Sequence, residues 1–301
     1  STWQAFRSTV PLKILCQPIP GKTAALKMGY EIARYGYVIN CDDDNWLNAD
    51  YVQKAYELIH SDPAIGAVGG KATAVYEQSP PEWFDQFSSC YAVGPQSTNE
   101  DATEKKCLYG AGMVIRREAF LKILSMDLEF ELSCRKGDGK KKIIGGGDTE
   151  MCFIFSLMGY KLLYHDALQF SHYIPLNRLN LGYLNRLFKG YGITLPLLST
   201  YEELLRCKVL NKKIDRYFWV INFLTCCKGM VADLFSWGVS HFLSRKSTLK
   251  KKMDFIFNKE VAYNYLRYNS YLTRRVTELH GKFCMNMQLE KSTNSPDHNQ
   301  R

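Results

Sequence analysis

The sequence lacks the patterns that mark small disulfide-linked or zinc-binding proteins. Its ten cysteines include no C-x-x-C pair and no regular spacing. This favours reduced, partly buried thiols, with a disulfide framework or a zinc site as the less favoured alternative. The first fifteen residues contain a proline and no apolar run, so that stretch does not have the pattern of a signal peptide. With 46% hydrophobic and 23% charged residues, the composition is ordinary for a globular protein with a core.

A long uninterrupted apolar run is also absent. The most apolar stretch, residues 217–243, has a charge-free core of 11 residues from Tyr217 to Cys227, whereas about 20 are needed to span a bilayer. The basic run RKSTLKKK at 245–252 follows directly. An apolar helix beside a basic cluster is typical of peripheral binding to anionic lipid. A core helix next to a solvated run of charges is the alternative interpretation, with equal weight.

The net charge of +9 is placed unevenly along the chain. Residues 1–200 contain 21 basic and 21 acidic side chains, whereas residues 201–301 contain 18 basic and 9 acidic ones. This asymmetry predicts an acidic partner surface for the last third of the chain. It also suggests a division into a body over 1–200, a basic helical region over 201–290 and a disordered tail over 291–301.

Helical spacing of apolar residues alternates with short, β-rich apolar runs. GYVIN at 36–40 and IGAVGG at 65–70 are typical of buried strands, the first of them parallel to its neighbours. The alternation of strand and helix predicts an α/β doubly wound sheet, and the pattern from about residue 176 onward is helical. The expected helix at 22–35 places its apolar positions at Ala25, Met28, Ile32 and Tyr35. Further helices are expected at 49–63, after the strand in 108–124 and after the glycines at 145–147, with an extended segment at 161–175 and a polar turn at 135–142.

Three aspartates, Asp42, Asp43 and Asp44, follow the first of these strands. Ligands bind at the carboxyl ends of strands in an open α/β sheet. Asp42 and Asp44, spaced as D-x-D, can both reach one hard divalent cation, either Mg²⁺ or Mn²⁺, which could hold a diphosphate. A turn or a helix cap is the alternative, because Asp and Asn45 are favoured in both.

Glycine-containing segments supply two further candidate ligand contacts. Gly21 and Lys22 open a helix, so backbone amides and the Lys22 ammonium group could face a phosphate, although the Walker spacing is absent. Gly110 and Gly112 could line a pocket for a flat ligand, and a tight entry into a strand explains them equally well.

A carboxylate and two histidines complete the candidate residues. Asp148 follows three glycines at the start of a helix, where it could act as a general base or simply as the N-cap, with Glu150 in the first turn. His165 and His172 could each give a nitrogen ligand to the same metal, although a single histidine is more often structural.

Taken in order, these segments resemble family 2 glycosyltransferases of the GT-A fold over roughly residues 1–195. The matching stretches are PGKTAALKMGYEIARYGYVINCDDDNWLNADYV, AVGG, GAGMVIRREAF and GGGDTEMCFIFSLMGYKLLYHDALQFSHYIP. The resemblance implies a nucleotide-diphosphate sugar donor and a divalent metal. It implies Asp148 as catalytic base, Asp42, Asp44 and His172 as metal contacts, and Gly21, Lys22, Asp42, Asp43, Asp44, Gly110 and Gly112 as nucleotide-sugar contacts.

The sequence departs from the family pattern at two places. Gly147 stands where the family has a glutamate before the base. The first strand and the turn that grip the nucleobase have no counterpart, so we expect that the N-terminus is truncated. A haloacid-dehalogenase-type phosphotransferase also has D-x-D after a strand, but it needs a small β-branched residue where Trp46 stands.

The resemblance implies an inverting, metal-assisted sugar transfer to an acceptor hydroxyl, in bacterial polysaccharide or glycan assembly. The expected acceptor is a saccharide or a lipid-linked molecule, and no nucleic acid partner is expected. We expect the chain in the cytoplasm, with peripheral contact to anionic membrane at the inner face of the plasma membrane. The alternative is a non-catalytic, truncated or degenerate GT-A domain that acts as a membrane-associated scaffold.

Overall fold

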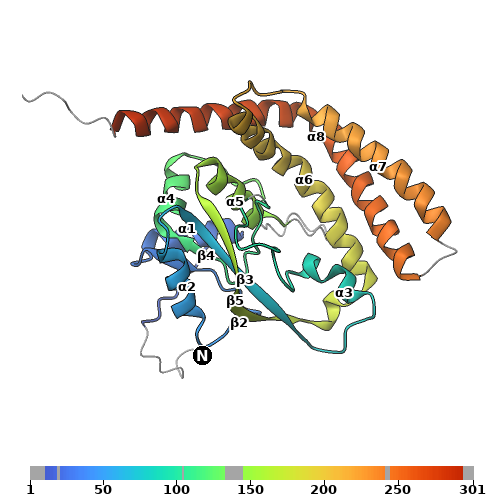
Figure 1. The fold of residues 1–301 in the computed structure, drawn as a ribbon, viewed down its shortest axis with the longest axis horizontal. Coiled ribbons are helices and arrows are strands. Elements are labelled where there is room, and N and C mark those ends of the chain that lie inside the picture. Colours follow the sequence, from blue (N-terminus) through green and yellow to red (C-terminus); the bar gives the residue numbers. More distant parts are fainter. Residues whose placement is uncertain (1–10, 19–20, 104, 133–144, 241–244, 294–301) are drawn as a thin grey trace, which may run out of the picture.

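A mixed five-stranded sheet forms the centre of the chain, with helices on both faces and a helical C-terminal region beside it (Figure 1). The computed structural model describes residues 11–18, 21–103, 105–132, 145–240 and 245–293. The strand order is β1-β4-β3-β5-β2. The strands are β1 (Tyr37–Ile39), β2 (Asn45–Leu47), β3 (Ile65–Tyr76), β4 (Val114–Arg116) and β5 (Lys161–Ile174).

The long central strands β3 and β5 are parallel, and the other pairs in the sheet are antiparallel. The close approach of the two long strands requires Gly70, because an added Cβ would lie 2.2 Å from the Leu168 carbonyl oxygen. The prediction of a buried parallel strand at 36–40 is wrong, because β1 is half-buried and pairs antiparallel with β4. A run of three apolar residues identifies a strand but carries no information about its partner.

Helices cover the two faces of the sheet with separate apolar clusters. On one face, α2 (Tyr51–His60) buries Tyr51, Ala55 and Ile59, which are spaced four residues apart and so lie on one side of the helix. The other face is covered by α1 (Lys22–Ile32), α4 (Arg117–Ser125) and α5 (Gly147–Leu157).

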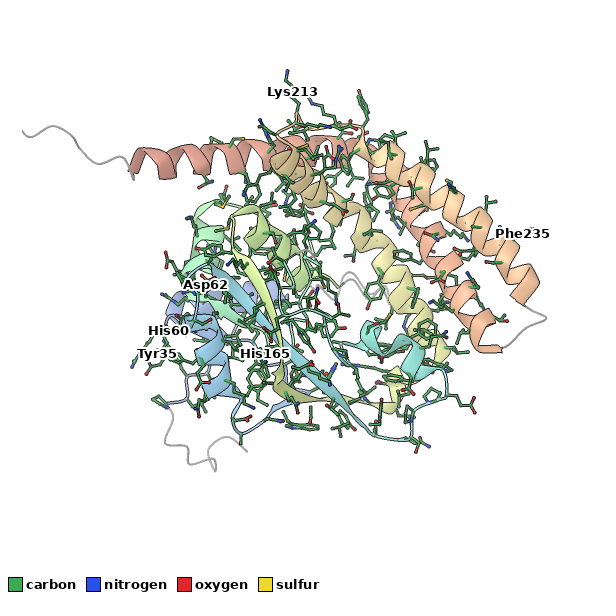
Figure 2. All side chains as sticks on the ribbon, in the orientation of Figure 1. Tyr35, His60, Asp62, His165, Lys213 and Phe235 are labelled. Carbon is green, nitrogen blue, oxygen red and sulfur yellow. The ribbon has the colours of Figure 1, made fainter. Side chains whose placement is uncertain are left out.

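The helix predicted at 22–35 is confirmed as α1, but its buried side differs from the one expected. Tyr30 is the buried residue of α1, and its ring stacks on Phe120 at a centroid distance of 4.0 Å. Ile32 and Tyr35 are 41% and 80% exposed, and Tyr35 lies at the surface (Figure 2). Apolar spacing alone therefore did not identify the face of this helix that meets the core.

Three long helices, α6 (Leu181–Leu210), α7 (Phe218–Ser240) and α8 (Arg245–Thr293), make up the C-terminal region (Figure 1). The helix α8 packs against both α6 and α7. The predicted domain boundary at residue 200 falls inside α6, and α8 continues three residues into the predicted tail, of which 294–301 lie outside the described residues.

In the loop-rich segment after β3, the described residues form two short helices, α3 (Phe84–Phe87) and η2 (Ser88–Tyr91), and η3 (Leu176–Arg178) follows β5. The described cysteines are all free, as the sequence predicts for reduced thiols, and Cys134 lies outside the described residues. The polar turn predicted at 135–142 also lies outside them.

Candidate functional site

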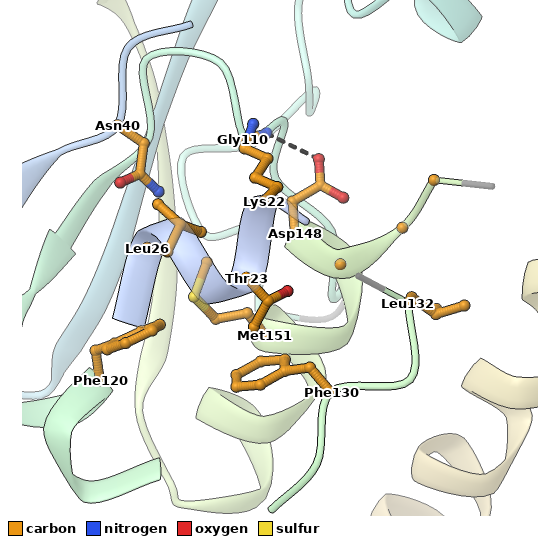
Figure 3. Close-up of a pocket in the computed structure, with 13 residues that line it drawn as sticks. Lys22, Thr23, Leu26, Asn40, Gly110, Phe120, Phe130, Leu132, Asp148 and Met151 are labelled. Atoms are coloured by element: carbon orange, nitrogen blue, oxygen red, sulfur yellow. Dashed lines mark hydrogen bonds between the residues drawn. The ribbon is translucent and has the colours of Figure 1, made fainter. Parts of the chain in front are cut away.

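Two neighbouring pockets lie beside the ends of β1, β4 and β5. The smaller, of about 150 Å³, has mainly apolar walls that include Phe120, Phe130 and Met151 (Figure 3). The larger, of about 350 Å³, is polar. The polar pocket is lined by Lys22, Asp42, Asp43, Asp44, Ala92, Gly110, Ala111, Asp148, His172 and Arg178. Lys22, Gly110 and Asp148 line both pockets, so Asp148 stands between a polar space and an apolar one.

Asn45 stabilises the turn that Asp42, Asp43 and Asp44 form, called the aspartate turn below. Its side-chain oxygen accepts a hydrogen bond from the Asp42 backbone N–H at 3.2 Å, and its amide nitrogen donates to Asp44 Oδ1 at 3.3 Å. Its own backbone N–H donates to the Asp42 carbonyl at 3.1 Å, which closes the turn. The turn interpretation is therefore correct, and this turn presents the aspartates to the polar pocket.

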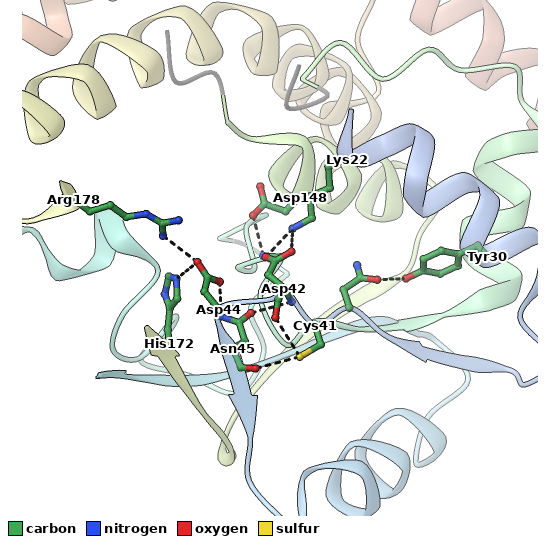
Figure 4. A network of polar contacts seen from close by, with 11 residues as sticks. Lys22, Tyr30, Cys41, Asp42, Asp44, Asn45, Asp148, His172 and Arg178 are labelled. Carbon is green, nitrogen blue, oxygen red and sulfur yellow. Dashed lines mark hydrogen bonds and ion pairs between the residues drawn. The ribbon is translucent and has the colours of Figure 1, made fainter. Parts of the chain in front are cut away.

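Lys22 neutralises Asp42. Its Nζ lies 2.8 Å from Asp42 Oδ1 and 3.0 Å from Oδ2, and both side chains are partly exposed (Figure 4). The lysine stands at the first position of α1, so the ammonium group and the positive end of the helix lie on the same side. The contact of Lys22 with a phosphate stays a prediction, for which the ligand would enter the pocket beside this ion pair.

Asp44 has different partners from Asp42. Its Oδ2 lies 3.6 Å from His172 Nε2 and 3.2 Å from a guanidinium nitrogen of Arg178. The short strand β2 brings these groups together, because Asn45 is paired with His172 across β2 and β5. Burial lowers the pKa of His172 below its usual value, and Arg178 acts in the same direction against the opposing charge of Asp44, which favours the neutral imidazole.

Arg178 is the site residue that the sequence analysis missed. It lies in η3, just after β5 ends, on the same side as Asp44 (Figure 4). Its position four residues beyond the end of the strand that carries His172 was the available signal, because loops after strand ends form the ligand-binding edge of such sheets.

Asp148 points toward the pockets from the first turn of α5. Its Oδ2 accepts the Gly110 backbone N–H at 2.9 Å, and its Oδ1 accepts the Thr149 N–H at 2.8 Å. A Cβ at residue 110 would lie 3.3 Å from Asp148 Oδ2 and 3.4 Å from Lys22 Nζ, so a glycine here lets the three groups meet. The positive end of the helix favours a carboxylate at this place.

The interpretation of Asp148 as the N-cap is wrong, because Gly146 occupies that position. Gly146 has φ of 104°, which a glycine adopts readily, and an added Cβ would lie 2.6 Å from Thr194 Cγ2. A glycine is therefore needed at position 146 because the backbone packs closely against α6, and not because a ligand approaches it.

Glu150 connects α5 to the C-terminal region. Its side chain is fully buried and accepts hydrogen bonds from the backbone N–H groups of Glu131 and Leu132 at 3.0 and 2.9 Å, and from the Tyr201 hydroxyl at 2.7 Å. From α8, Arg275 donates to the Glu129 carbonyl at 2.8 Å. Burial raises the pKa of Glu150, and these hydrogen bonds oppose that shift.

We expect Glu150→Gln to lower the free energy of unfolding by about 1–3 kcal/mol. The amide places an NH₂ group against one of the backbone donors, so a buried donor loses its acceptor. Urea denaturation followed by circular dichroism measures the effect, with the exposed Glu82→Gln as matched control. Equal free energies of unfolding for the two variants would show that the hydrogen bonds of Glu150 to Glu131, Leu132 and Tyr201 do not stabilise the fold.

Three predicted residues lie outside the polar pocket. Gly21 precedes α1 without lining either pocket. Gly112 serves packing, because an added Cβ would lie 2.8 Å from the hydroxyl oxygen of Tyr51. His165 faces Glu100 at 3.4 Å on another part of β5, so it does not join His172.

The donor types of the polar pocket fit a hard divalent cation, although the three predicted ligands do not converge. Within the described residues, no group of three or more His, Cys, Asp or Glu is arranged to hold a metal ion. Asp42 is turned to Lys22, which leaves Asp44 and the neutral His172 as the neighbouring oxygen and nitrogen donors. The pocket walls carry two more carboxylates than cationic side chains, which favours a cation there.

The chain was compared with known proteins. Residues 2–124 match the model of Glycosyl transferase family 2. The matched range ends before Asp148. No curated protein matches the chain. Among solved structures, a mannosyltransferase from Pyrobaculum calidifontis in complex with GDP-Man and Mn²⁺ is 16% identical, with 81% of this chain and 66% of that one covered and a TM-score of 0.42. GalNAc-T7 with UDP, GalNAc and Mn²⁺ is 14% identical, with 62% and 41% covered and a TM-score of 0.37.

The family match agrees with the architecture. The mixed sheet flanked by helices and the helical C-terminal region confirm the predicted GT-A fold class. The aspartate turn and the Gly110 segment lie inside the matched range, whereas Asp148, His172 and Arg178 lie beyond it and reach the same pocket through the fold. Residues 2–124 of this chain are therefore similar to glycosyl transferase family 2.

Proposed function

We propose that the chain transfers a sugar from a nucleotide-diphosphate sugar to an acceptor hydroxyl, with inversion at the anomeric carbon. One observation carries the proposal: the polar pocket unites the aspartate turn of the family 2 segment with Asp148, which comes from a helix about a hundred residues later. A carboxylate base and a charged phosphate-binding site are the two elements that direct displacement needs.

The residues of the polar pocket divide between the donor and the acceptor. Lys22 and Arg178 are the cationic side chains of the pocket and would bind the diphosphate oxygens. A divalent cation at Asp44 and His172, with Asp42 beside them, would neutralise negative charge on the leaving diphosphate. Lys22 can move from Asp42 to a phosphate because both side chains are partly exposed.

Asp148 is the base in this proposal. It takes the proton from the acceptor hydroxyl, whose oxygen forms a bond to the anomeric carbon while the bond from that carbon to the diphosphate oxygen breaks. The nucleoside diphosphate leaves on the opposite side, so the configuration inverts. The apolar pocket on the other side of Asp148 gives space for an acceptor, a saccharide or a lipid-linked one, as used in glycan assembly.

The test is a panel of UDP, GDP and dTDP sugars with Mg²⁺ or Mn²⁺. We expect one of them to give metal-dependent release of nucleoside diphosphate that an acceptor accelerates, measured by chromatography. Binding of a donor by calorimetry without any release would support the non-catalytic scaffold instead. Neither binding nor release with any donor would contradict the proposal.

A further inference from the structure

One side of α7 is apolar and uncovered in the described part of the chain. The exposed fractions are 64% for Ile221, 59% for Leu224, 69% for Val231, 49% for Leu234 and 78% for Phe235. Ile221, Leu224, Val231 and Phe235 follow one another at intervals of three, seven and four residues, so they lie on one face of the helix. Phe235 lies on the outer side of α7, away from the body (Figure 2). An exposed apolar face of this kind marks an interaction surface.

The opposite side of α7 is held by α8 along its length. The Trp219 indole N–H donates to Thr273 Oγ1 at 3.2 Å near one end, and Asn258 donates to Asp233 Oδ2 at 2.8 Å near the other. The stretch Phe218–Ser236 has the length and composition of a membrane span, and 6% of it is buried. Because α8 covers one side throughout, α7 is built to rest on a surface rather than to be surrounded by lipid.

Within α7, the charged residue on the exposed side is basic. Asp233, the acidic residue of α7, is turned toward α8, whereas Lys228 lies on the exposed side among the apolar residues. A lysine there can bury its hydrocarbon stem and keep its ammonium group at the level of phosphate groups.

Basic residues stand at both ends of the apolar face. Lys212, Lys213 and Arg216 are exposed just before α7. Lys250 and Lys252 are exposed in the first turns of α8. The start of α8 lies beside the end of α7, because the two helices run antiparallel (Figure 1). A second copy of the chain packed α7 to α7 would bring lysines against lysines in either direction, whereas an anionic surface complements both ends.

We infer that the outer face of α7 docks on an anionic lipid bilayer. The helix lies parallel to the membrane, with Ile221, Leu224, Val231 and Phe235 below the headgroups and the flanking lysines on lipid phosphates. This inference is independent of the proposed transfer reaction, because it rests on α7 and its flanks and on no residue of the two pockets.

The test is co-sedimentation of the whole chain with vesicles of equal parts phosphatidylglycerol and phosphatidylcholine. We expect binding that weakens on pure phosphatidylcholine and at high salt, because screening reduces the attraction of exposed charges. The variant V231S/F235S is expected to lose at least about 10-fold in affinity, since two apolar side chains no longer leave water. Lys250→Glu with Lys252→Glu is expected to lose about 10-fold on the anionic vesicles alone.

The matched control is Y35S/V52S, which removes one aromatic and one valine side chain of similar exposure, 80% and 63%, from the body. We expect it to bind vesicles as the unaltered chain does, and circular dichroism should show all variants folded. Equal binding by V231S/F235S and the unaltered chain would overturn the inference. So would absence of vesicle binding together with a concentration-dependent dimer in sedimentation velocity that V231S/F235S abolishes, because a second copy would then cover the face.

Discussion

Asp148→Asn is expected to lower kcat by about 10²–10⁴-fold, the usual contribution of general base catalysis, while donor affinity stays nearly unchanged. The asparagine keeps the shape of the side chain, so the hydrogen bond from the Gly110 N–H at 2.9 Å can be preserved with the amide oxygen. The variant cannot accept a proton, so the acceptor hydroxyl must attack without losing its proton first. Steady-state kinetics on the donor identified by the panel measures the effect.

The control for Asp148 is Asp85→Asn, an exposed aspartate in α3 outside both pockets. It should retain full activity, which separates loss of the base from a general effect of removing a charge. Full transfer rate in the Asp148 variant would show that another group accepts the proton. A large fall in donor affinity with unchanged kcat would instead place Asp148 in donor binding.

The sequence predicted the elements of the fold well where local signals were strong. The helices that became α1, α2 and α5 begin near the residues expected, because glycine or aspartate precedes each of them. Burial of IGAVGG within β3 was also predicted correctly, since an apolar run of that kind suits a covered strand. The direction of β1 was not, because pairing depends on segments far away in the chain.

The site was predicted as a list of residues but not as an arrangement. The turn at Asp42 to Asp44 and the helix start at Asp148 have recognisable local patterns. Asp42 pairs with Lys22, whereas Asp44 lies beside His172. The second contact arises from the antiparallel pairing of β2 with β5, which places Asn45 opposite His172. Arg178 could have been found only from its place just after the strand that carries His172. Glu150 acts through contacts between distant segments, so no local spacing in the sequence reveals its role.

The arrangement around the aspartates leads to a second large effect, on Asp44. We expect Asp44→Ala to lower kcat by about 10²–10³-fold, the range typical of removing one group that stabilises charge in a transition state. Asp44 faces His172 and Arg178, whereas Asp42 is neutralised by Lys22, so Asp44 is the carboxylate nearest the neutral nitrogen donor. Asp85→Ala is the matched control and should leave the rate unchanged.

Chelation distinguishes a metal-holding Asp44 from one that only orients Arg178. EDTA should slow the unaltered chain by a factor similar to the Asp44→Ala substitution, and it should slow the variant little further. Two changes that remove the same interaction are not additive, whereas independent ones multiply in rate. An Asp44→Ala chain that is slowed by EDTA as much as the unaltered chain would mean that the cation is held without Asp44, and that this carboxylate serves mainly to position Arg178 for the diphosphate.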